Sequence, residues 1–250
     1  MRTKNIVIAI STFALLIAAW ELLAKIGAYN TFLLPPPTES IAAIMKLWRE
    51  GLLQADVLSS MQRYLPGFII GGSIGIVAGV ISGISKNIQA SVNPLFHYLR
   101  SIPPVALIPF VLVLFGIGDV GKVSLVAWAC FFPVWLSTQA GIKQVPREYI
   151  WAADVFAVKG LRRVVDVWVP FALPYILSGV RISVATGLFA LAAAEMFAAS
   201  SGIGFRIVYS HQLFQTDTMV GMILLLGLIA LVMDQLLYFL VKRVARWESE

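Results

Sequence analysis

The hydrophobic residues of this chain gather into long runs that are separated by polar or charged stretches. A helix that crosses a membrane needs about 20 mostly apolar residues. Six runs meet or approach this length: 5–23, 63–84, 102–117, 122–142, 172–199 and 219–241. The pattern therefore predicts an all-α, polytopic membrane helix bundle of about six transmembrane helices, in a single domain that spans residues 1–250.

Two connections between the runs are long enough to have structure of their own. Residues 28–62 contain the sequence LLPPPT at 33–38, where three prolines fix an extended turn and Thr38 can cap the helix that follows. Residues 143–171 form the most charged stretch of the chain. We expect an interfacial helix in the first connection and a docking surface in the second.

Composition excludes the main alternatives to a membrane protein. Of the 250 residues, 59% are hydrophobic and 13% are charged, and the mean hydropathy is +0.86. A soluble domain carries about 25% charged residues, and a disordered chain has low hydrophobicity. Cys130 is the single cysteine, so the chain has no internal disulfide and no cysteine metal cluster.

The distribution of Lys and Arg predicts how the bundle is oriented. With the N-terminus inside, the inside connections hold twelve Lys and Arg, including Arg100, and the outside connections hold six. Cytoplasmic loops carry the excess of basic residues. Both termini and residues 143–171 are therefore expected in the cytoplasm, and residues 28–62 outside. The net charge of +6 is a topology signal and gives no support to nucleic-acid binding.

Small residues recur at helical spacing in two of the runs. Every fourth residue lies near one stripe of a helix, and small residues let two helices in a membrane approach closely. We interpret these stripes as packing surfaces within the bundle, with a subunit interface or a permeation path as the alternative. The two sets are Gly67, Gly71, Gly75, Gly79 and Gly83, and the weaker Gly179, Ser183 and Gly187.

Polar residues and prolines at membrane depth are candidates for a translocation path. Ionisable residues there face protein or water, and carbonyls freed by proline need a covered or water-filled site. The third run is thus expected to be buried near the centre of the bundle. For Glu195 the alternative is a satisfied structural carboxylate. The candidates are Ser101, Pro103, Pro104, Glu195, Met196 and Ser200.

The sequence contains no constellation for catalysis. Residues 116–123 read GIGDVGKV, which has the spacing of a phosphate-binding loop, but Val123 stands where that loop needs Ser or Thr to hold magnesium. Glu195 and Asp234 lie on different runs without a His, Ser or metal partner. Asp234 either pairs with a neighbouring helix or caps a cavity. We therefore expect that the chain is not an enzyme.

The stretch 148–182 resembles the cytoplasmic signature of binding-protein-dependent ABC importer permeases. Ala152, Ala153, Leu173 and Pro174 match that signature in register. Two positions depart from it: Trp151 stands at the usual glutamate position and Ala157 at the usual glycine position, where Glu148 and Gly160 are possible replacements. The segments 33–38, 100–104, 115–118 and 194–204 resemble the branch that carries sulfonates, taurine, nitrate and bicarbonate, with relatives for thiamine precursors.

The resemblance implies a type I ABC importer permease in the bacterial inner membrane. A homodimer would form the path, two ATPase subunits would bind ATP and magnesium inside, and a solute-binding protein would deliver the solute outside. The solute would be a small anion, a sulfonate-like compound or a vitamin precursor. A membrane scaffold that docks an ATPase without importing a solute is the alternative.

The same resemblance implies that a cytoplasmic helix of about residues 147–157 lies in a groove of the ATPase. Acidic residues of this helix would pair with the groove, small ones would allow close approach, and Trp151 would be an anchor. Lys159, Arg162 and Arg163 would lie along anionic lipid headgroups. An ordinary amphipathic interfacial helix is the alternative. The implied coupling residues are Glu148, Trp151, Ala152, Ala153, Asp154, Ala157 and Gly160.

Overall fold

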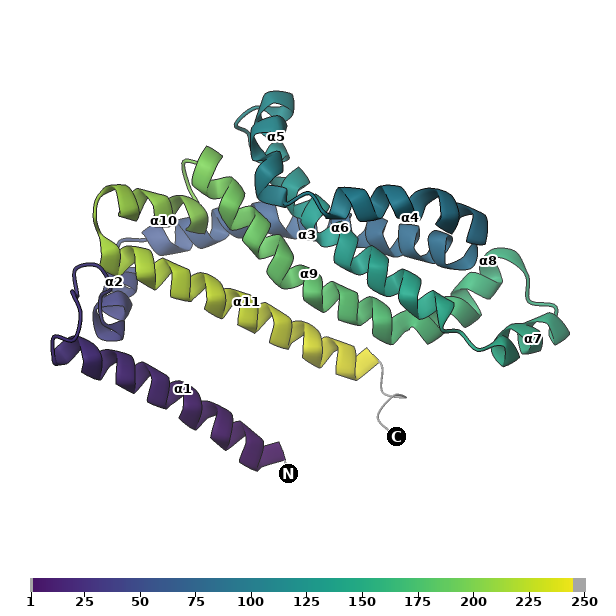
Figure 1. The fold of residues 1–250 in the computed structure, drawn as a ribbon, viewed down its shortest axis with the longest axis horizontal. Coiled ribbons are helices and arrows are strands. Elements are labelled where there is room, and N and C mark those ends of the chain that lie inside the picture. The colour runs from purple at the N-terminus through teal and green to yellow at the C-terminus, as the bar shows by residue number, and fades with distance from the viewer. Residues whose placement is uncertain (1, 245–250) are drawn as a thin grey trace.

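The computed structural model describes residues 2–244, with side chains for residue 8 and residues 11–239, and this part of the chain is helical and has no strands (Figure 1). Met1 and residues 245–250, including the Arg246 of the charge count, lie outside the described residues. The elements are α1 (Arg2–Lys25), α2 (Pro37–Arg49), α3 (Leu52–Ile84), α4 (Lys86–Arg100), η1 (Pro104–Leu107), α5 (Ile108–Phe115), α6 (Asp119–Lys143), α7 (Arg147–Val155), α8 (Gly160–Arg163), η2 (Val164–Trp168), α9 (Val169–Ala198), α10 (Ile203–Gln212) and α11 (Thr216–Val244).

Four segments of the described part are long and apolar enough to cross a membrane. They are α3, α6, the joined segment from α8 to α9, and α11. Helix α4 and the η1–α5 segment pass the same test together as one bent span, and α1 is a continuous helix over the first predicted run. The predicted all-α membrane bundle is confirmed. Helix α3 begins at Leu52, well before the predicted start at residue 63.

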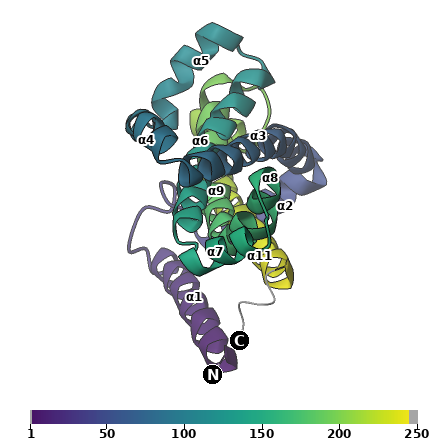
Figure 2. The same ribbon diagram turned by 90° about the vertical axis from the view of Figure 1, so that its right-hand side faces the viewer.

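The third predicted run, 102–117, is broken at its prolines as expected, but it is largely exposed, so the expectation that it is buried near the centre of the bundle is wrong. The chain bends by 85° between α4 and η1–α5. Pro103 and Pro104 cause this break because neither has an N–H for a helical hydrogen bond. Only Ile108 and Val111 of α5 are buried, and Val113 is 85% exposed. Figure 2 shows α5 at the rim of the molecule.

Helix α6 is the central helix because both stripes of small residues pack against it. A Cβ at Gly67 would lie 2.6 Å from the Cβ of Val126, and a Cβ at Gly179 would lie 2.7 Å from the Cβ of Ser137. No side chain fits at such distances, so glycine sets how closely α3 and α9 approach α6. The remaining members of the stripes that have α6 as a neighbour are Gly71, Gly75, Gly79, Gly83, Gly187 and, through its carbonyl oxygen, Ser183.

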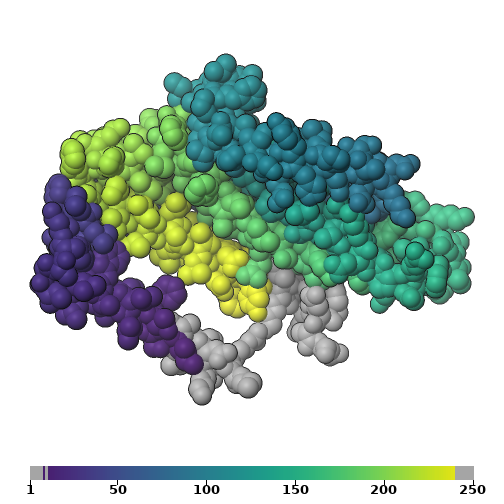
Figure 3. Space-filling model, in the orientation of Figure 1, coloured from purple at the N-terminus to yellow at the C-terminus, as the bar shows by residue number. Residues whose placement is uncertain are grey.

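The two ends of the bundle carry different elements. Helices α2 and α10 lie at one end, and α7 and α8 lie at the opposite end (Figure 1). Helix α1 lies apart from the bundle and is joined to it through α2 (Figures 1 and 3). At this joint Thr38 donates a hydrogen bond of 3.0 Å from Oγ1 to Glu21. Apolar side chains of α1 such as Phe13 are exposed, as expected for a surface that lipid or protein covers.

Candidate functional site

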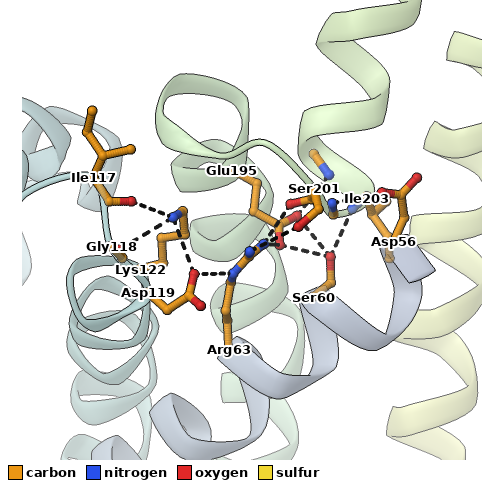
Figure 4. Close-up of polar contacts among 12 residues, drawn as sticks. Asp56, Ser60, Arg63, Ile117, Gly118, Asp119, Lys122, Glu195, Ser201 and Ile203 are labelled. Atoms are coloured by element: carbon orange, nitrogen blue, oxygen red, sulfur yellow. Dashed lines mark hydrogen bonds and ion pairs between the residues drawn. The ribbon is translucent and has the colours of Figure 1, made fainter. Parts of the chain in front are cut away.

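A group of buried polar side chains lies near the α2–α10 end, where α3, α6 and the connection between α9 and α10 meet (Figure 4). Arg63 of α3 is at its centre. Its Nε donates to Asp119 Oδ1 at 2.6 Å, and its Nη1 donates to Glu195 Oε1 at 2.9 Å and to the carbonyl oxygen of Ser201 at 2.7 Å. One guanidinium therefore joins three elements.

Glu195 is 1% exposed and has two donors besides Arg63. Ser60 Oγ lies 2.9 Å from both carboxylate oxygens, and the backbone N–H of Gly204 donates to Oε2 at 3.0 Å. A charge is retained in a protein interior when it is paired and hydrogen-bonded in this way. The geometry favours the structural alternative for Glu195, a carboxylate that holds helices together.

Asp56 fixes the start of α10 from the same face of α3. Its Oδ2 accepts from Arg206 Nε at 2.6 Å, and its Oδ1 accepts from the backbone N–H of Gly202 at 2.9 Å. Gly202 has φ +124°, and a Cβ there would overlap the carboxylate of Glu195. Glycine is required at this position both for its backbone conformation and for space.

The sequence pattern predicts Glu195 but does not point to its partners. Asp56, Ser60 and Arg63 lie at positions i, i+4 and i+7 of α3, the spacing of one helix face. This signal depends on a helix that begins at Leu52, whereas hydrophobicity alone starts the run at residue 63. A search for polar residues at helical spacing ahead of an apolar run would have found them.

Lys122, the lysine of the loop-like segment 116–123, belongs to the edge of this polar group. Its Nζ donates to the carbonyl oxygen of Ile117 at 2.8 Å and lies 3.4 Å from Asp119 Oδ1. The ammonium is engaged by the turn that precedes α6. This segment therefore has a structural role as a helix start, in agreement with the missing magnesium ligand at Val123.

The predicted coupling residues lie on α7 and its following turn, at the opposite end of the bundle (Figure 1). Trp151 is 61% and Phe156 80% exposed, and Glu148 and Ala152 are exposed as well. Ala153 is an exception, since it is buried against the chain itself. Helix α7 therefore turns Ala153 inward and its large apolar residues outward, and of the small residues expected to allow close approach, Ala152 and Ala157 are exposed.

The turn after α7 explains why a glycine is usual at the Ala157 position of the resembled signature. Ala157 has φ +52°. Its N–H donates to the carbonyl oxygen of Asp154 at 3.0 Å, and the N–H of Val158 donates to that of Ala153 at 2.8 Å. This pair of bonds is a Schellman motif, whose left-handed residue is most often glycine. Gly160, with φ +59°, starts α8 and does not take over this position.

Two charged residues of this segment are paired within the chain, which corrects their expected roles. The resemblance implies a partner's groove for Asp154 and lipid headgroups for Arg163, but Arg163 Nη2 forms an ion pair with Asp154 Oδ1. Arg163 Nε also donates to the carbonyl oxygen of Val158 at 3.0 Å. The reason is the tight turn at Ala157, which folds the start of α8 back towards α7.

A groove of about 640 Å³ lies between α6, α9 and the bend that precedes η1. Of the predicted path residues, Pro104 lines it, and the lining does not include Ser101, Pro103, Glu195, Met196 or Ser200. The groove is lined by Arg100, Ile102, Pro104, Trp128, Ala129, Phe132, Pro133, Leu136, Ser137, Ile182, Ala185, Thr186 and Phe189. Arg100 is the charged residue among them, and the charge count placed it in an inside connection.

One side of this groove is closed by apolar packing. About one turn beyond the groove along α6 and α9, Leu125 and Ala194 pack against Ile108 and Val111 of α5. This cluster lies towards the end that carries the Arg63 group. The groove therefore ends at a packed layer on that side.

Asp234 pairs with a neighbouring helix, which was one of its two expected roles. Arg181 of α9 contacts it with two hydrogen bonds, from Nε at 2.9 Å and from Nη2 at 2.7 Å, and the guanidinium lies 5.1 Å from the ring centre of Tyr238. A bidentate pair of this kind fixes direction as well as distance. It joins α9 to α11 at membrane depth.

Comparison with known proteins identifies the family. The model of the "Binding-protein-dependent transport system inner membrane component" family matches residues 71–246. The chain is 34% identical to the putative aliphatic sulfonates transport permease protein SsuC of Escherichia coli (strain K12), over 93% of this chain and 88% of SsuC. It is 28% identical to the taurine transport system permease protein TauC of the same organism, over 99% of this chain and 92% of TauC.

A bicarbonate transport system permease protein, CmpB of Synechococcus elongatus, is 28% identical over 91% of this chain and 85% of its own length. Among solved structures, an inward-facing conformation of the MetNI methionine ABC transporter matches with a TM-score of 0.61 and 20% identity, over 80% of this chain and 96% of that chain. The structural match supports the fold, and the sequence matches confirm the resemblance and its branch. This chain belongs to the family of binding-protein-dependent transport system inner membrane components and is the permease subunit of an ABC importer, not its ATPase.

Proposed function

We propose that this permease forms half of a path for a small anionic solute and that α7 couples the path to a separate ATPase. The observation that carries the coupling proposal is the exposed apolar surface of α7. At one end of the bundle the exposed apolar residues are Tyr149, Trp151 and Val155 of this nine-residue helix and Phe156 directly after it, all outside the candidate spans. Apolar patches that remain exposed mark interaction sites, and tryptophan is a frequent anchor in them.

The connection from α7 to α9 supports a mechanical role. The turn at Ala157 and the Arg163–Asp154 ion pair hold α7 against the start of α8. From Gly160 to Ala198 the chain continues as one candidate span of 39 residues, through α8, η2 and α9. A displacement of α7 would therefore be transmitted to α9, which contributes Ile182, Thr186 and Phe189 to the groove.

The π-helical segment η2 lies between the docking helix and the groove wall. Short π-helical turns are rare and occur frequently at functional sites. We propose η2 as the place where the direction of α9 adjusts when α7 moves. The candidate docking surface and the groove are thus connected by continuous backbone.

Coupling requires that the ATPase holds α7 differently in its two states, because a partner shifts a conformational equilibrium only by its differential affinity. ATP and magnesium would bind to the ATPase. In this chain, Trp151 would fill a pocket of the partner, and Glu148, which has no ion-pair partner among the described residues, would pair with a basic group there. Two ATPase subunits would serve two copies of the permease.

The proposed solute class comes from the relatives. Their names refer to aliphatic sulfonates, taurine and bicarbonate, which are small solutes with an oxyanion group. A second copy of this chain would complete the path, and a solute-binding protein would deliver the solute to the α2–α10 end. The excess of Lys and Arg at the other connections supports this orientation, with the α7 end in the cytoplasm.

The test uses the complete transporter in lipid vesicles, with its ATPase and its solute-binding protein. We predict that Trp151→Ala lowers uptake about tenfold or more and removes the stimulation of ATP hydrolysis by the binding protein, as expected for loss of an interface anchor. Phe13→Ala is the matched control, because Phe13 is also an exposed aromatic residue but lies in the middle of α1, outside both α7 and the α2–α10 end. Normal uptake by Trp151→Ala would contradict the coupling role. If ATP hydrolysis by the unaltered transporter does not respond to the binding protein, the alternative is favoured: a membrane scaffold that docks an ATPase without importing a solute.

A further inference from the structure

Arg100 lies at the last position of α4, where the chain bends towards η1, and it lines the groove between α6 and α9. Helix α4 is held in place by its neighbour α6. Gln139 Nε2 donates to Asn93 Oδ1 at 2.8 Å, and the ring of Phe96 packs edge-on against Trp135 with 5.1 Å between the ring centres. The backbone that carries Arg100 is therefore anchored at two points within the preceding two turns.

The groove offers Arg100 no partner of opposite charge. No Asp or Glu is among the residues that line it, and within the described part of the chain Arg100 forms no ion pair. The other polar groups of the groove lining include the hydroxyls of Ser137 and Thr186. Arg100 is exposed, so its guanidinium is open to a ligand that enters the groove. Arg181 differs, because it is paired with Asp234 in a structural role.

The rest of the groove wall is apolar and aromatic, with Trp128, Phe132 and Phe189 as its large members. Binding sites for small molecules have this composition: a mostly apolar wall of about 300–1,000 Å³ with a few polar groups that fix orientation. An apolar wall also strengthens the attraction between a guanidinium and an anion, because water screens it less. The groove fits a solute that has one oxyanion and a short apolar body.

We propose that this groove is an anion-selective contact point of the path, where Arg100 binds the sulfonate or carboxylate group of a small organic anion. The planar guanidinium donates two parallel hydrogen bonds to two oxygens of the oxyanion. The aromatic residues contact the carbon part of the solute. The contact is weak, because a path must release what it binds. This inference rests on the proposed function of the chain as half of a solute path.

The first test measures local charge selection and needs no transport. Cys130 is buried and is the only native cysteine, so an Ala185→Cys variant presents one accessible thiol in the groove. Its rate of modification is compared for two methanethiosulfonate reagents, one that carries a sulfonate and one that carries a trimethylammonium group. We expect the anionic reagent to react several-fold faster relative to its rate with a free thiol, and ethanesulfonate to slow it.

The control is the same measurement with Arg100→Gln added. The anionic preference is expected to disappear in this double variant and to persist when Lys86→Gln is added instead, since Lys86 begins α4 and does not line the groove. Equal relative rates with and without Arg100 would overturn the proposal. A preference that also disappears with Lys86→Gln would overturn it too, because the effect would then come from general surface charge.

The second test is uptake by the complete transporter in vesicles, with taurine and ethanesulfonate as probes. Arg100→Gln is expected to lower uptake about tenfold, the factor for loss of a charge-assisted hydrogen bond of typical strength. Arg100→Lys is expected to fall in between, because it keeps the charge and loses the planar fork. Unchanged uptake in Arg100→Gln overturns the anion contact and leaves the proposed function intact, whereas absence of uptake in the unaltered transporter contradicts the proposed function itself.

Size measurement of the purified assembly separates one further outcome. If Arg100→Gln splits the dimer of permeases, Arg100 is a subunit contact and the proposal is overturned. If the dimer persists while uptake and thiol selectivity both fall, the anion contact is supported.

Discussion

Ala157 holds a left-handed backbone conformation, with φ +52°, that costs an alanine about 1–2 kcal/mol. The surrounding hydrogen bonds keep it there, because the Schellman motif that closes α7 requires positive φ at this residue. The strain is located in the turn that links the candidate docking helix to α8. The Cβ of Ala157 therefore lowers the stability of this turn.

We predict that Ala157→Gly stabilises the turn by about 1 kcal/mol, because glycine adopts this conformation without a steric penalty. The measurement is amide hydrogen exchange of residues 153–158 in the purified transporter, where exchange should become slower. Ala152→Gly is the control, since Ala152 lies inside α7 and glycine there should loosen the helix by about 0.5–1 kcal/mol. Faster exchange in Ala157→Gly would show that the turn is not held in this conformation.

At the scale of single residues, the sequence shows which residues depart from an expected pattern, but it does not show what surrounds them in the fold. The mismatch at Ala157 is visible in the sequence, but its backbone conformation depends on where α7 ends. Likewise, Asp154 is a plausible partner for another protein until the turn brings Arg163 to it. The sequence does not indicate that Arg100 lines a groove, because a basic residue between two hydrophobic runs is also typical of an ordinary loop.

Between elements, the contact of α3 with α6 depends on glycine. We predict that Gly71→Ala destabilises the permease by about 1–3 kcal/mol, because its Cβ would overlap the carbonyl of Ala127 and the two helices would have to separate. Gly72→Ala is the matched control, since nothing lies within 4 Å of a Cβ at Gly72. The measurement is thermal unfolding in detergent. Equal midpoints for the two variants would contradict the close packing of α3 on α6.

The Arg63 group is the polar counterpart of this packing. We predict that Arg63→Met destabilises the chain by about 3–5 kcal/mol, because it leaves the buried carboxylate of Glu195 without its cation. Asp119→Asn should cost less than about 1 kcal/mol, because the side chain of Asp119 is 64% exposed and water replaces its partner. Denaturant unfolding of both variants tests this order, and a larger loss in Asp119→Asn would reverse the assignment.

At the scale of elements, hydrophobic runs predict most helices because each span must bury its backbone polar groups in its own hydrogen bonds. The runs fail where a helix begins before the apolar part, as at residues 52–61 of α3, whose polar face is visible only by its spacing. They also fail at the third run, where Pro103 and Pro104 lie between two short helices that form a bent pair. The glycine stripes can be predicted, because only small residues allow two helices to approach each other closely.

The whole molecule has a polar, cross-linked end and an end with an exposed docking helix. At the first end the Arg63 group and the apolar layer at Ile108 hold α3, α5, α6, α9 and α10 together. At the other end α7 is held by its turn, by the Arg163–Asp154 ion pair and by the contact of Tyr149 with Phe171. Movement at the α7 end would therefore change the groove while the cross-linked end acts as a support. The distribution of Lys and Arg predicts which end faces the cytoplasm. The groove cannot be predicted in this way, because its lining residues come from segments that only the fold brings together.

We propose that α7 faces the cytoplasm and is covered there by an ATPase. Cys130 is buried, so a Val155→Cys variant carries one exposed thiol on α7, and Phe214→Cys places one at the opposite end. Labelling with a membrane-impermeant maleimide measures which side each thiol faces. We predict that Cys at position 155 is labelled in inverted membrane vesicles, is protected when the ATPase is added, and stays unlabelled in intact cells, where position 214 reacts. Labelling of position 155 in intact cells would contradict the orientation, the docking surface and the coupling mechanism together.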